Sequence, residues 1–278
     1  MRKTNRQVKK MKMRKLAVLD MYAGHANQGM RCIAALAKDA GYELDVFEVR
    51  QNGAFPDVRD YSLFISTGGP GDPHEVEQLP WGAGFVQFLS NIKIHNEVET
   101  NPRKHAFLIC HSFQMACIVW KLADVTKRQR PGFGIYPFNK TRAGLEDPLL
   151  GELDDPFYAI DSRDWQVIHP NAVAMDDFGA RVTAIERERP HVPLERAAMA
   201  IRFTPEIFGT QFHPEADESG MQAYLNDPEK LAKLIELHAE DRIDKIREHL
   251  GDPNKVNKTP SLLIPAFLRQ SEFAAKLR

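Results

Sequence analysis

The sequence predicts an α/β fold in which a mostly parallel sheet carries helices on both faces and continues into an antiparallel extension. Up to residue 122, short apolar runs typical of buried strands alternate with segments of helical periodicity, and glycine-containing turns separate them. After residue 122, short strand-like segments follow one another without helical periodicity, which favours antiparallel pairing. A chain of 278 residues, 43% hydrophobic and 27% charged, can form one large domain of this kind or two small ones.

The composition argues against several classes of protein. A formal net charge of −1 gives no support for nucleic-acid binding, and no apolar run approaches the roughly 18 residues of a membrane span. The three cysteines lack metal-ligand spacing, which indicates reduced thiols, a cytoplasmic location and no metal site. The sequence has neither the Gly-Lys-Ser/Thr of a phosphate loop nor a G-x-G-x-x-G after its first strand, so no cofactor is expected.

Local patterns support each element of the predicted parallel half. Residues 1–15 contain Arg and Lys but no acid and are expected to form a basic N-terminal arm. Gly41 ends the first helix, whose apolar residues recur on one face. The predicted strands are residues 16–19, 44–49, 61–66 and 106–109, and the predicted helices are residues 27–40, about 84–95 and a segment that begins after residue 110.

The second half is expected to pair as an antiparallel ribbon and to end in a helix. Its predicted strands are residues 133–140, 157–160, 173–175, 181–185, 198–203 and 208–211. Asp227 and Pro228 mark the start of a helix, which Gly251 ends. We therefore expect one domain over residues 16–251 and a C-terminal tail over residues 252–278. The apolar segment 262–268 of this tail either packs on its own domain or docks a partner.

Cys110 is predicted to lie at a sharp junction between a strand and a helix. The apolar run 106–109 precedes it, and Phe113, Ala116, Cys117 and Trp120 follow at helical spacing. A turn of this kind exposes the sulfur above a helix N-terminus, whose dipole and free N–H groups stabilise a thiolate. The alternative is a buried core cysteine.

Two further motifs supply the other parts that acyl transfer requires. A thiolate of Cys110 would attack a carbonyl, His213 would hold and return the proton, and Glu215 would fix the histidine tautomer. Backbone N–H groups of the turn Gly68-Gly-Pro-Gly71 and of the residue after the nucleophile can bind the developing oxyanion.

This set resembles the class I glutamine amidotransferases in the order Gly-Gly-Pro-Gly, Cys, His-Pro-Glu, over about residues 16–225. The resemblance implies a flavodoxin-like sheet and a catalytic triad of Cys110, His213 and Glu215. It implies an oxyanion hole formed by the N–H groups of Gly69 and His111. It also implies a set of substrate-binding residues, namely Gln114, Ser162, Asp164 and Trp165.

The activity that this resemblance implies is hydrolysis of glutamine or a γ-glutamyl compound. Ammonia would leave the glutamine side-chain amide as a cysteine thioester forms. Because the sequence contains no ATP-binding motif, an ammonia-accepting synthetase would have to be another chain, in trans.

The sequence departs from the family pattern around the nucleophile and in one loop. Leu108 and Ser112 stand where the family has glycine, and a side chain at a tight turn strains it or narrows the pocket. His111 directly after the cysteine resembles the peptidase and deglycase branch of the superfamily, and residues 162–167 lack the His-Gly of the family loop. Three alternatives therefore remain: a γ-glutamyl peptide hydrolase, a Cys-His peptidase and a catalytically silent regulatory relative.

Overall fold

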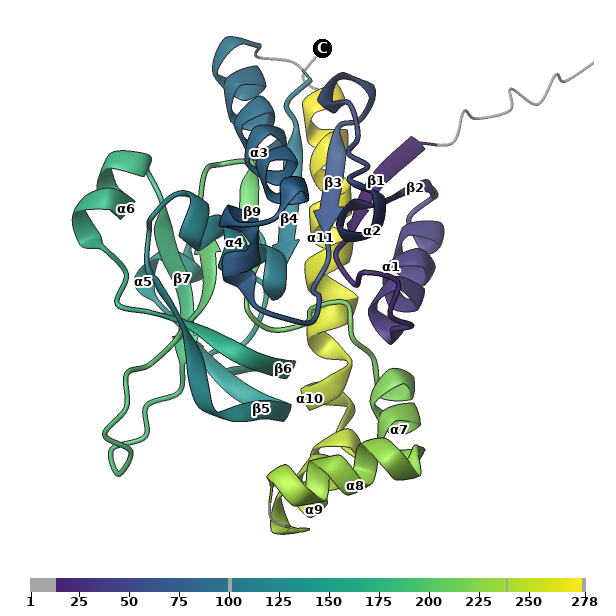
Figure 1. The fold of residues 1–278 in the computed structure, drawn as a ribbon, viewed down its shortest axis with the longest axis vertical. Helices are drawn as coiled ribbons and strands as arrows, with labels where there is room; N and C mark the ends of the chain where they lie inside the picture. Colours follow the sequence, from purple (N-terminus) through teal and green to yellow (C-terminus); the bar gives the residue numbers. More distant parts are fainter. Residues whose placement is uncertain (1–13, 100–101, 239, 277–278) are drawn as a thin grey trace, which may run out of the picture.

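One mixed sheet organises the computed structural model, which describes residues 14–99, 102–238 and 240–276. The strand order is β2-β1-β3-β4-β9-β8-β7-β5-β6 (Figure 1). The first five strands in this order are parallel: β2 (Tyr42–Glu48), β1 (Arg14–Asp20), β3 (Leu63–Ser66), β4 (His105–Ile109) and β9 (Ile207–Thr210). The other four extend the sheet in antiparallel fashion: β8 (Ala198–Arg202), β7 (Arg181–Glu186), β5 (Asp124–Lys140) and β6 (Phe157–Ile168).

The predicted fold class is confirmed, and the parallel half has the flavodoxin-like strand order. In such sheets ligands bind at the carboxyl ends of the strands, near the point where the strand order reverses. That point lies here between β1 and β3. The glycine turn follows β3, Cys110 follows β4 and His213 follows β9, so the topology brings all three motifs to one edge.

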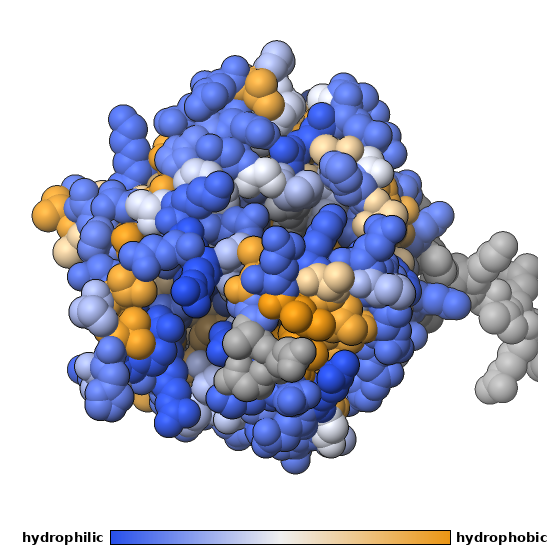
Figure 2. Space-filling model, turned by 60° about the horizontal axis from the view of Figure 1, so that its bottom comes forward, coloured by the Kyte–Doolittle hydropathy of each residue, from blue (hydrophilic) through white to orange (hydrophobic). Residues whose placement is uncertain are grey.

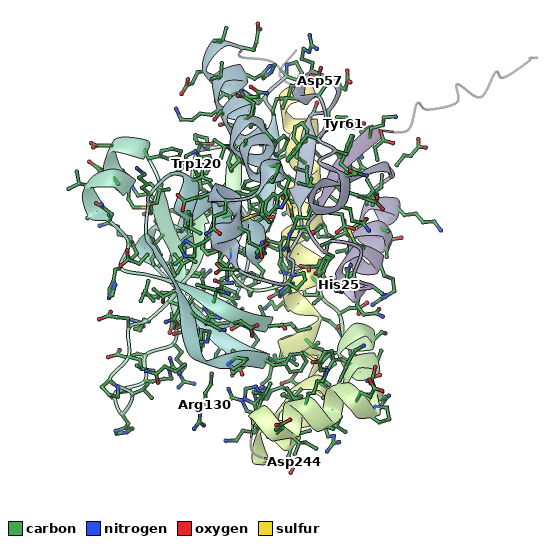
Figure 3. The ribbon with its side chains drawn as sticks, viewed as in Figure 1. His25, Asp57, Tyr61, Trp120, Arg130 and Asp244 are labelled. Carbon is green, nitrogen blue, oxygen red and sulfur yellow. The ribbon has the colours of Figure 1, made fainter. Side chains whose placement is uncertain are left out.

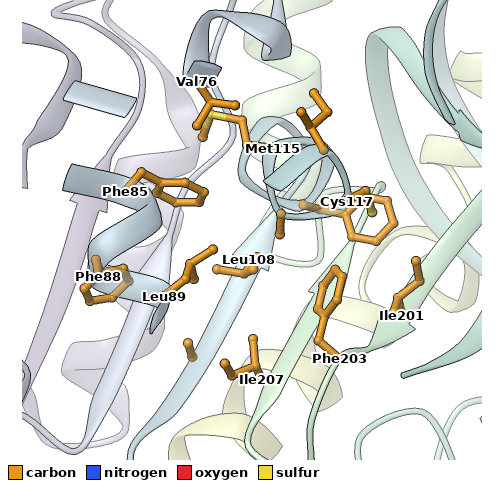
Figure 4. Close-up of a cluster of buried hydrophobic side chains, with 14 of the residues drawn as sticks. Val76, Phe85, Phe88, Leu89, Leu108, Met115, Cys117, Ile201, Phe203 and Ile207 are labelled. Atoms are coloured by element: carbon orange, nitrogen blue, oxygen red, sulfur yellow. The ribbon is translucent and has the colours of Figure 1, made fainter. Parts of the chain in front are cut away.

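Helices cover both faces of the parallel half because its strands are apolar on both sides. In β4, Ala106 and Leu108 belong to one core cluster, whereas Phe107 and Ile109 belong to the other. Helices α3 (Pro80–Val98) and α4 (His111–Val119) pack on the first face, where their apolar side chains surround Leu108 (Figure 4). Helices α1 (Gln28–Asp39) and α11 (Lys258–Lys276) pack on the second.

The C-terminal segment belongs to the core of the sheet and is not a separate tail. In α11, Leu263, Ile264, Phe267 and Leu268 are fully buried. The Phe267 ring lies 5.4 Å from the ring of Phe107, and α11 runs along the sheet in Figure 1. Of the two alternatives for the apolar segment 262–268, the structure supports packing on the chain's own domain. Its buried side chains are not available to dock a partner. The predicted basic arm lies mostly outside the described residues.

Other differences from the predicted elements have local or tertiary causes. Residues 173–175 lie in helix α6 (Ala172–Phe178) and not in a strand, because Asn171 caps the helix start and Gly179 ends it in the left-handed conformation. The strand predicted over residues 208–211 corresponds to β9, which ends at residue 210. It was expected in the antiparallel ribbon, but it also pairs in parallel with β4 and so joins the two halves of the sheet. The long C-terminal helix is divided at His238 into α8 (Pro228–Leu237) and α9 (Glu240–Leu250).

Helices α7 (Glu218–Asn226), α8, α9 and α10 (Pro253–Val256) pack together against the β5–β6 ribbon (Figure 1). Figure 2 views this end of the molecule and shows an apolar patch among hydrophilic side chains. In α8, Ile235 is 40% exposed and Leu237 is 50% exposed.

The remaining short elements are α2 (Val49–Asn52), α5 (Arg142–Leu145) and two 3₁₀ turns, Val58–Asp60 and Pro73–Glu77. Among the described helices, none is both long and apolar enough to cross a membrane.

Candidate active site

Cys110 occupies the sharp turn that the sequence predicts. It follows β4 directly, precedes α4, and has φ 47° and ψ −97°. This left-handed conformation strains a residue with a Cβ and costs of order 1–3 kcal/mol. Its N–H donates to the Thr210 carbonyl over 2.7 Å, and its carbonyl accepts from the Gln114 N–H over 3.0 Å. The sheet and the first turn of the helix therefore hold the strained residue from both sides.

His213 is placed beside Cys110 by the end of β9 and is oriented by Glu215. Its Nδ1 lies 2.9 Å from Glu215 Oε1, and its backbone N–H donates to the Ile160 carbonyl over 2.8 Å. Burial acts to lower the pKa of His213, but the Glu215 carboxylate and the Cys110 sulfur overcome it and raise the pKa well above its ordinary value. These contacts thus favour the protonated form of His213 between Glu215 and Cys110.

Two neighbours contact the Cys110 sulfur directly. Gln211 Nε2 lies 3.5 Å from Sγ and can donate to a thiolate, while the Ser162 carbonyl lies 3.7 Å from Sγ and accepts from the thiol. The same carbonyl lies 3.4 Å from His213 Nε2. Gln211 is fully buried and was not predicted, although it lies within the motif that ends in His-Pro-Glu. Gln114 donates to Gln211 Oε1 over 3.1 Å and is thus linked to the sulfur through Gln211.

The glycine turn after β3 lies directly under the triad. A Cβ at Gly68 would lie 2.9 Å from His213 Cε1, and a Cβ at Gly69 would lie 2.3 Å from the Met21 carbonyl oxygen. In the described part of the chain, no hydrogen bond uses the N–H of Gly69 or of His111. Both residues line the same cavity as Cys110. Two residues of the cavity lining thus carry backbone N–H groups that the described residues leave unused.

Side chains from three elements hold this turn in place. Arg50 Nη1 donates to the carbonyls of Pro70 and Met21 over 2.5 and 3.1 Å. Ser112 donates to the Thr67 carbonyl over 2.6 Å and accepts from the Ser66 hydroxyl over 2.8 Å. The serine that replaces a family glycine thus ties the start of α4 to the glycine turn. Leu108, the other departure, has its side chain in the core and leaves the pocket unaffected.

The cavity above the triad has a volume of about 840 Å³. Along β6, Ser162 and Asp164 are exposed toward it, Arg163 between them is buried, and Trp165 is partly buried in its wall. All three, predicted as substrate-binding, line this cavity, as does Gln114. The loop after β1 adds His25, labelled in Figure 3, and the segment 230–238 adds several residues that the sequence did not single out: Lys230, Lys233, Leu234 and Leu237.

Tyr22 is a further site residue that the sequence analysis missed. A Cβ at Gly68 would lie 3.5 Å from its hydroxyl oxygen, which places the hydroxyl beside the triad. Burial, together with the charges of Glu215 and Cys110, raises the pKa of Tyr22 well above its ordinary value. Its hydroxyl therefore remains protonated at neutral pH. Its position two residues after the end of β1 was its signal in the sequence.

Cys110 is expected to react with iodoacetamide before the other two cysteines. Cys117 is fully buried in the core, where burial raises its pKa. Cys32 borders the cavity, but burial and Asp217 raise its pKa to about 11, so only about one part in a thousand is thiolate at pH 8. Mass mapping after brief labelling measures the order, with denatured protein as the control. Equal labelling of all three cysteines in the native protein would contradict the assignment.

His111 is unsuited to act as the base of a Cys-His peptidase. Its side chain is buried, with 1% exposed, and its Nε2 has no hydrogen-bond partner among the described residues. Burial and the nearby Arg50 guanidinium lower its pKa to about 3. A neutral imidazole of such low basicity is a poor proton acceptor.

The same burial predicts a loss of stability in acid. The pKa of His111 is about 3 in the folded state and 6.5 for the free group, so below pH 6.5 the unfolded state binds a proton that the folded state does not. Stability should therefore fall as pH falls from 6.5 toward 3, by up to about 1.4 kcal/mol per pH unit from this group. Urea unfolding at several pH values should show a shallower decline for His111→Gln than for the exposed-site control His191→Gln. Equal declines would contradict this account.

The described residues contain no group of three or more His, Cys, Asp or Glu side chains arranged to hold a metal ion. The groups gathered at the edge of the sheet are a sulfur, an imidazole, a carboxylate and backbone donors.

Comparison with solved structures places the fold among known ones. The chain superimposes on a glutamine amidotransferase from Thermotoga maritima with TM-score 0.66 and 13% identity, covering 94% of this chain and 98% of that one. A glutamine amidotransferase from Methylobacillus flagellatus gives TM-score 0.59 and 14% identity over 95% and 94% of the two chains. A putative GMP synthase component from Thermoplasma acidophilum gives TM-score 0.55 and 16% identity over 81% and 97%.

No family model matches the sequence, and no curated protein matches it significantly. At these low identities the structural likeness shows a shared fold. The shared fold is consistent with the resemblance to class I glutamine amidotransferases that the sequence motifs show.

Proposed function

We propose that this chain is a cysteine hydrolase of the class I glutamine amidotransferase type that releases ammonia from the side-chain amide of glutamine. The observation that carries the proposal is the arrangement in one cavity of Cys110 at its strained turn and His213 on Glu215. The free N–H groups of Gly69 and His111 complete it. The shared fold with amidotransferases of known structure supports it.

The proposed reaction runs in two halves. The Cys110 thiolate attacks the amide carbon, and the N–H groups of Gly69 and His111 stabilise the oxyanion. The C–N bond then breaks as His213 gives its proton to the departing ammonia, leaving a γ-glutamyl thioester. Water, deprotonated by His213, attacks the thioester, and breakage of the C–S bond releases glutamate and restores the thiolate. Glu215 keeps Nδ1 of His213 protonated throughout.

Charged side chains in the cavity suit the amino-acid end of the substrate. Asp164 on one wall can pair with an α-ammonium group, and Lys230 and Lys233 can pair with an α-carboxylate. Trp165 packs edge-on against His74, with ring centroids 5.5 Å apart, and forms an apolar wall for the methylene groups. Together with the Ser162 carbonyl, these residues are the proposed substrate-binding set.

A γ-glutamyl hydrolase is the second candidate function, and the size of the cavity favours it. A volume of about 840 Å³ lies in the range of about 300–1,000 Å³ typical of sites for drug-sized ligands. A larger γ-glutamyl compound could place its γ-glutamyl end at Cys110 and its leaving group against α8. The chemistry at Cys110 would be the same, with an amine in place of ammonia.

An ammonia-accepting synthetase on another chain is the remaining part of the proposal. One similar structure is described as a putative component of GMP synthase, which is consistent with such a partnership. Leu263, Ile264, Phe267 and Leu268 are buried in the core, so a partner would have to use another surface. If turnover of glutamine by the purified chain rises on addition of cell extract, the partner model is supported. High turnover that extract leaves unchanged would indicate a self-sufficient hydrolase.

The experiment that tests the function is product analysis with the purified full-length chain. Glutamine and a panel of γ-glutamyl amines are incubated with the protein, and ammonia, amine and glutamate are quantified. We expect ammonia and glutamate in equal amounts from glutamine, and none with Cys110→Ala. Preference for the γ-glutamyl amines would support the second candidate. No turnover of any compound, with or without extract, would favour a catalytically silent relative.

A further inference from the structure

A second cavity lies beside the active site, between the β5–β6 ribbon and helix α9. Its volume is about 420 Å³. It shares part of its wall with the active-site cavity, including Arg163 and His238. Figure 3 shows Arg130 on the side of the ribbon where α9, marked by Asp244, also lies.

The lining of this cavity is strongly basic. Among the lining residues whose side chains the structure describes, seven are Arg or Lys, and the acidic ones are Asp161 and Glu186. Glu186 is already shared by three guanidinium groups: Arg163 at 2.5 Å, Arg189 at 3.1 Å and Arg128 at 3.4 Å. Two carboxylates therefore cannot neutralise the cations around them, and the cavity carries a surplus of positive charge.

Arg163 is the deepest of these cations, and part of it has no partner. Its side chain is almost completely buried, with 1% exposed. Nε pairs with Asp161 and Nη2 with Glu186, but Nη1 has no hydrogen-bond partner among the described residues. Leaving a buried charged donor unpaired is costly, so an unpaired guanidinium nitrogen on a residue that lines the cavity points to a missing acceptor.

Two other groups in the lining bear on the ligand. Asp161 Oδ1 is also buried without a partner among the described residues, and it would accept a hydrogen bond from a hydroxyl group or a protonated oxygen. Burial and the charges of Arg242 and Arg130 lower the pKa of His238, which keeps this wall residue neutral. An anion in the cavity would offset the repulsion among these cations.

We propose that this second cavity is a binding site for a small polyanion, carrying a phosphate group or several carboxylates and at least one hydroxyl or protonated oxygen. Arg163 Nη1 would donate to an acceptor oxygen at the inner end of the site, and Asp161 would accept from the hydroxyl or protonated oxygen. Arg130, from β5, and Lys245, from α9, would close over the ligand from opposite walls. Guanidinium groups suit this role because they form paired, charge-assisted hydrogen bonds to phosphate and carboxylate.

The site adjoins the proposed catalytic centre without depending on its chemistry. Arg163 follows Ser162 in β6, and the Ser162 carbonyl lies 3.7 Å from the Cys110 sulfur. A ligand bound to Arg163 would therefore contact the strand that forms one wall of the active site. Binding can be measured directly, so its failure is distinguishable from a failure of the proposed function.

The test is calorimetric titration of the purified full-length protein at constant ionic strength, with sodium pyrophosphate in one arm and citrate in the other. The cavity variant is Arg130→Gln/Lys245→Gln, and both side chains are exposed at the rim. The matched control is Arg59→Gln/Lys121→Gln, with the same loss of charge at exposed positions that do not line the cavity. Loss of two charge-assisted contacts should weaken binding by about tenfold to a hundredfold, with the control within about twofold of wild type.

Each outcome decides the matter. Tighter binding of pyrophosphate than of citrate assigns a phosphate ligand, and the reverse order assigns a polycarboxylate. Equal weakening in the cavity variant and the control would mean attraction by overall charge and would overturn the proposal. Absence of binding of either probe at millimolar concentration would overturn it as well.

Discussion

Replacing His213 by Asn is expected to reduce turnover by about 10⁴-fold or more, because the proposed reaction requires His213 to give up and take back a proton. The side chain lies between Glu215, 2.9 Å from Nδ1, and the sulfur of Cys110, which raises its pKa together with that carboxylate. Asparagine fills a similar position but cannot accept and return a proton. The measurement is kcat/KM for the compound that is turned over best.

The companion variant Glu215→Gln separates orientation from proton transfer. Glu215 is 2% exposed, and its Oε2 has no partner among the described residues. Glutamine can hold the imidazole in place, but its amide group can also select the wrong tautomer. A loss that reaches about 10⁴-fold, yet stays below that of His213→Asn, is expected by analogy with serine proteases. Circular dichroism controls for folding. Full activity in His213→Asn would instead indicate His111 as the base and revive the peptidase alternative.

Gly69→Ala is expected to lower kcat by about 10²–10³-fold while changing KM little, the cost of losing one oxyanion donor. A methyl group at this position would lie 2.3 Å from the Met21 carbonyl oxygen, which is main chain and cannot rotate away. The glycine turn would have to move, and the proposed donor N–H of Gly69 would move with it. Because oxyanion contacts form mainly in the transition state, the loss should appear in kcat.

Gly251→Ala is the matched control, since a Cβ there meets its nearest neighbour at 3.4 Å, an ordinary contact. Thermal unfolding of both variants separates a displaced turn from general destabilisation. If Gly69→Ala retains wild-type kcat, the N–H of Gly69 is not an oxyanion donor. If its activity falls only in proportion to the folded fraction, the residue has a structural role alone.

Local sequence patterns were sufficient to predict the parallel half of the fold and the order of the three motifs. Strands such as β4 are apolar on both faces, so short apolar runs between glycine turns identify them without tertiary information. Parallel strands end at one edge, and for that reason a glycine turn after β3 and a cysteine after β4 meet there. The sharp turn at Cys110 was expected from the adjoining strand and helix patterns, because such a turn is local, whereas its left-handed conformation became apparent only in the structure.

Packing between distant segments established the length of the ribbon, the position of α11 and the composition of both cavities. Residues 124–132 carry Lys127, Arg128 and Arg130 in no strand-like pattern, and they form part of β5 because β6 pairs with them. From the sequence alone, the apolar face of α11 could pack on its own domain or on another protein. The contact between Phe267 and Phe107 shows that it packs on its own domain. Gln211, Tyr22 and the surplus of cations around Arg163 became apparent for the same reason. Contacts between residues far apart in sequence depend on packing and strand pairing, which no local pattern encodes.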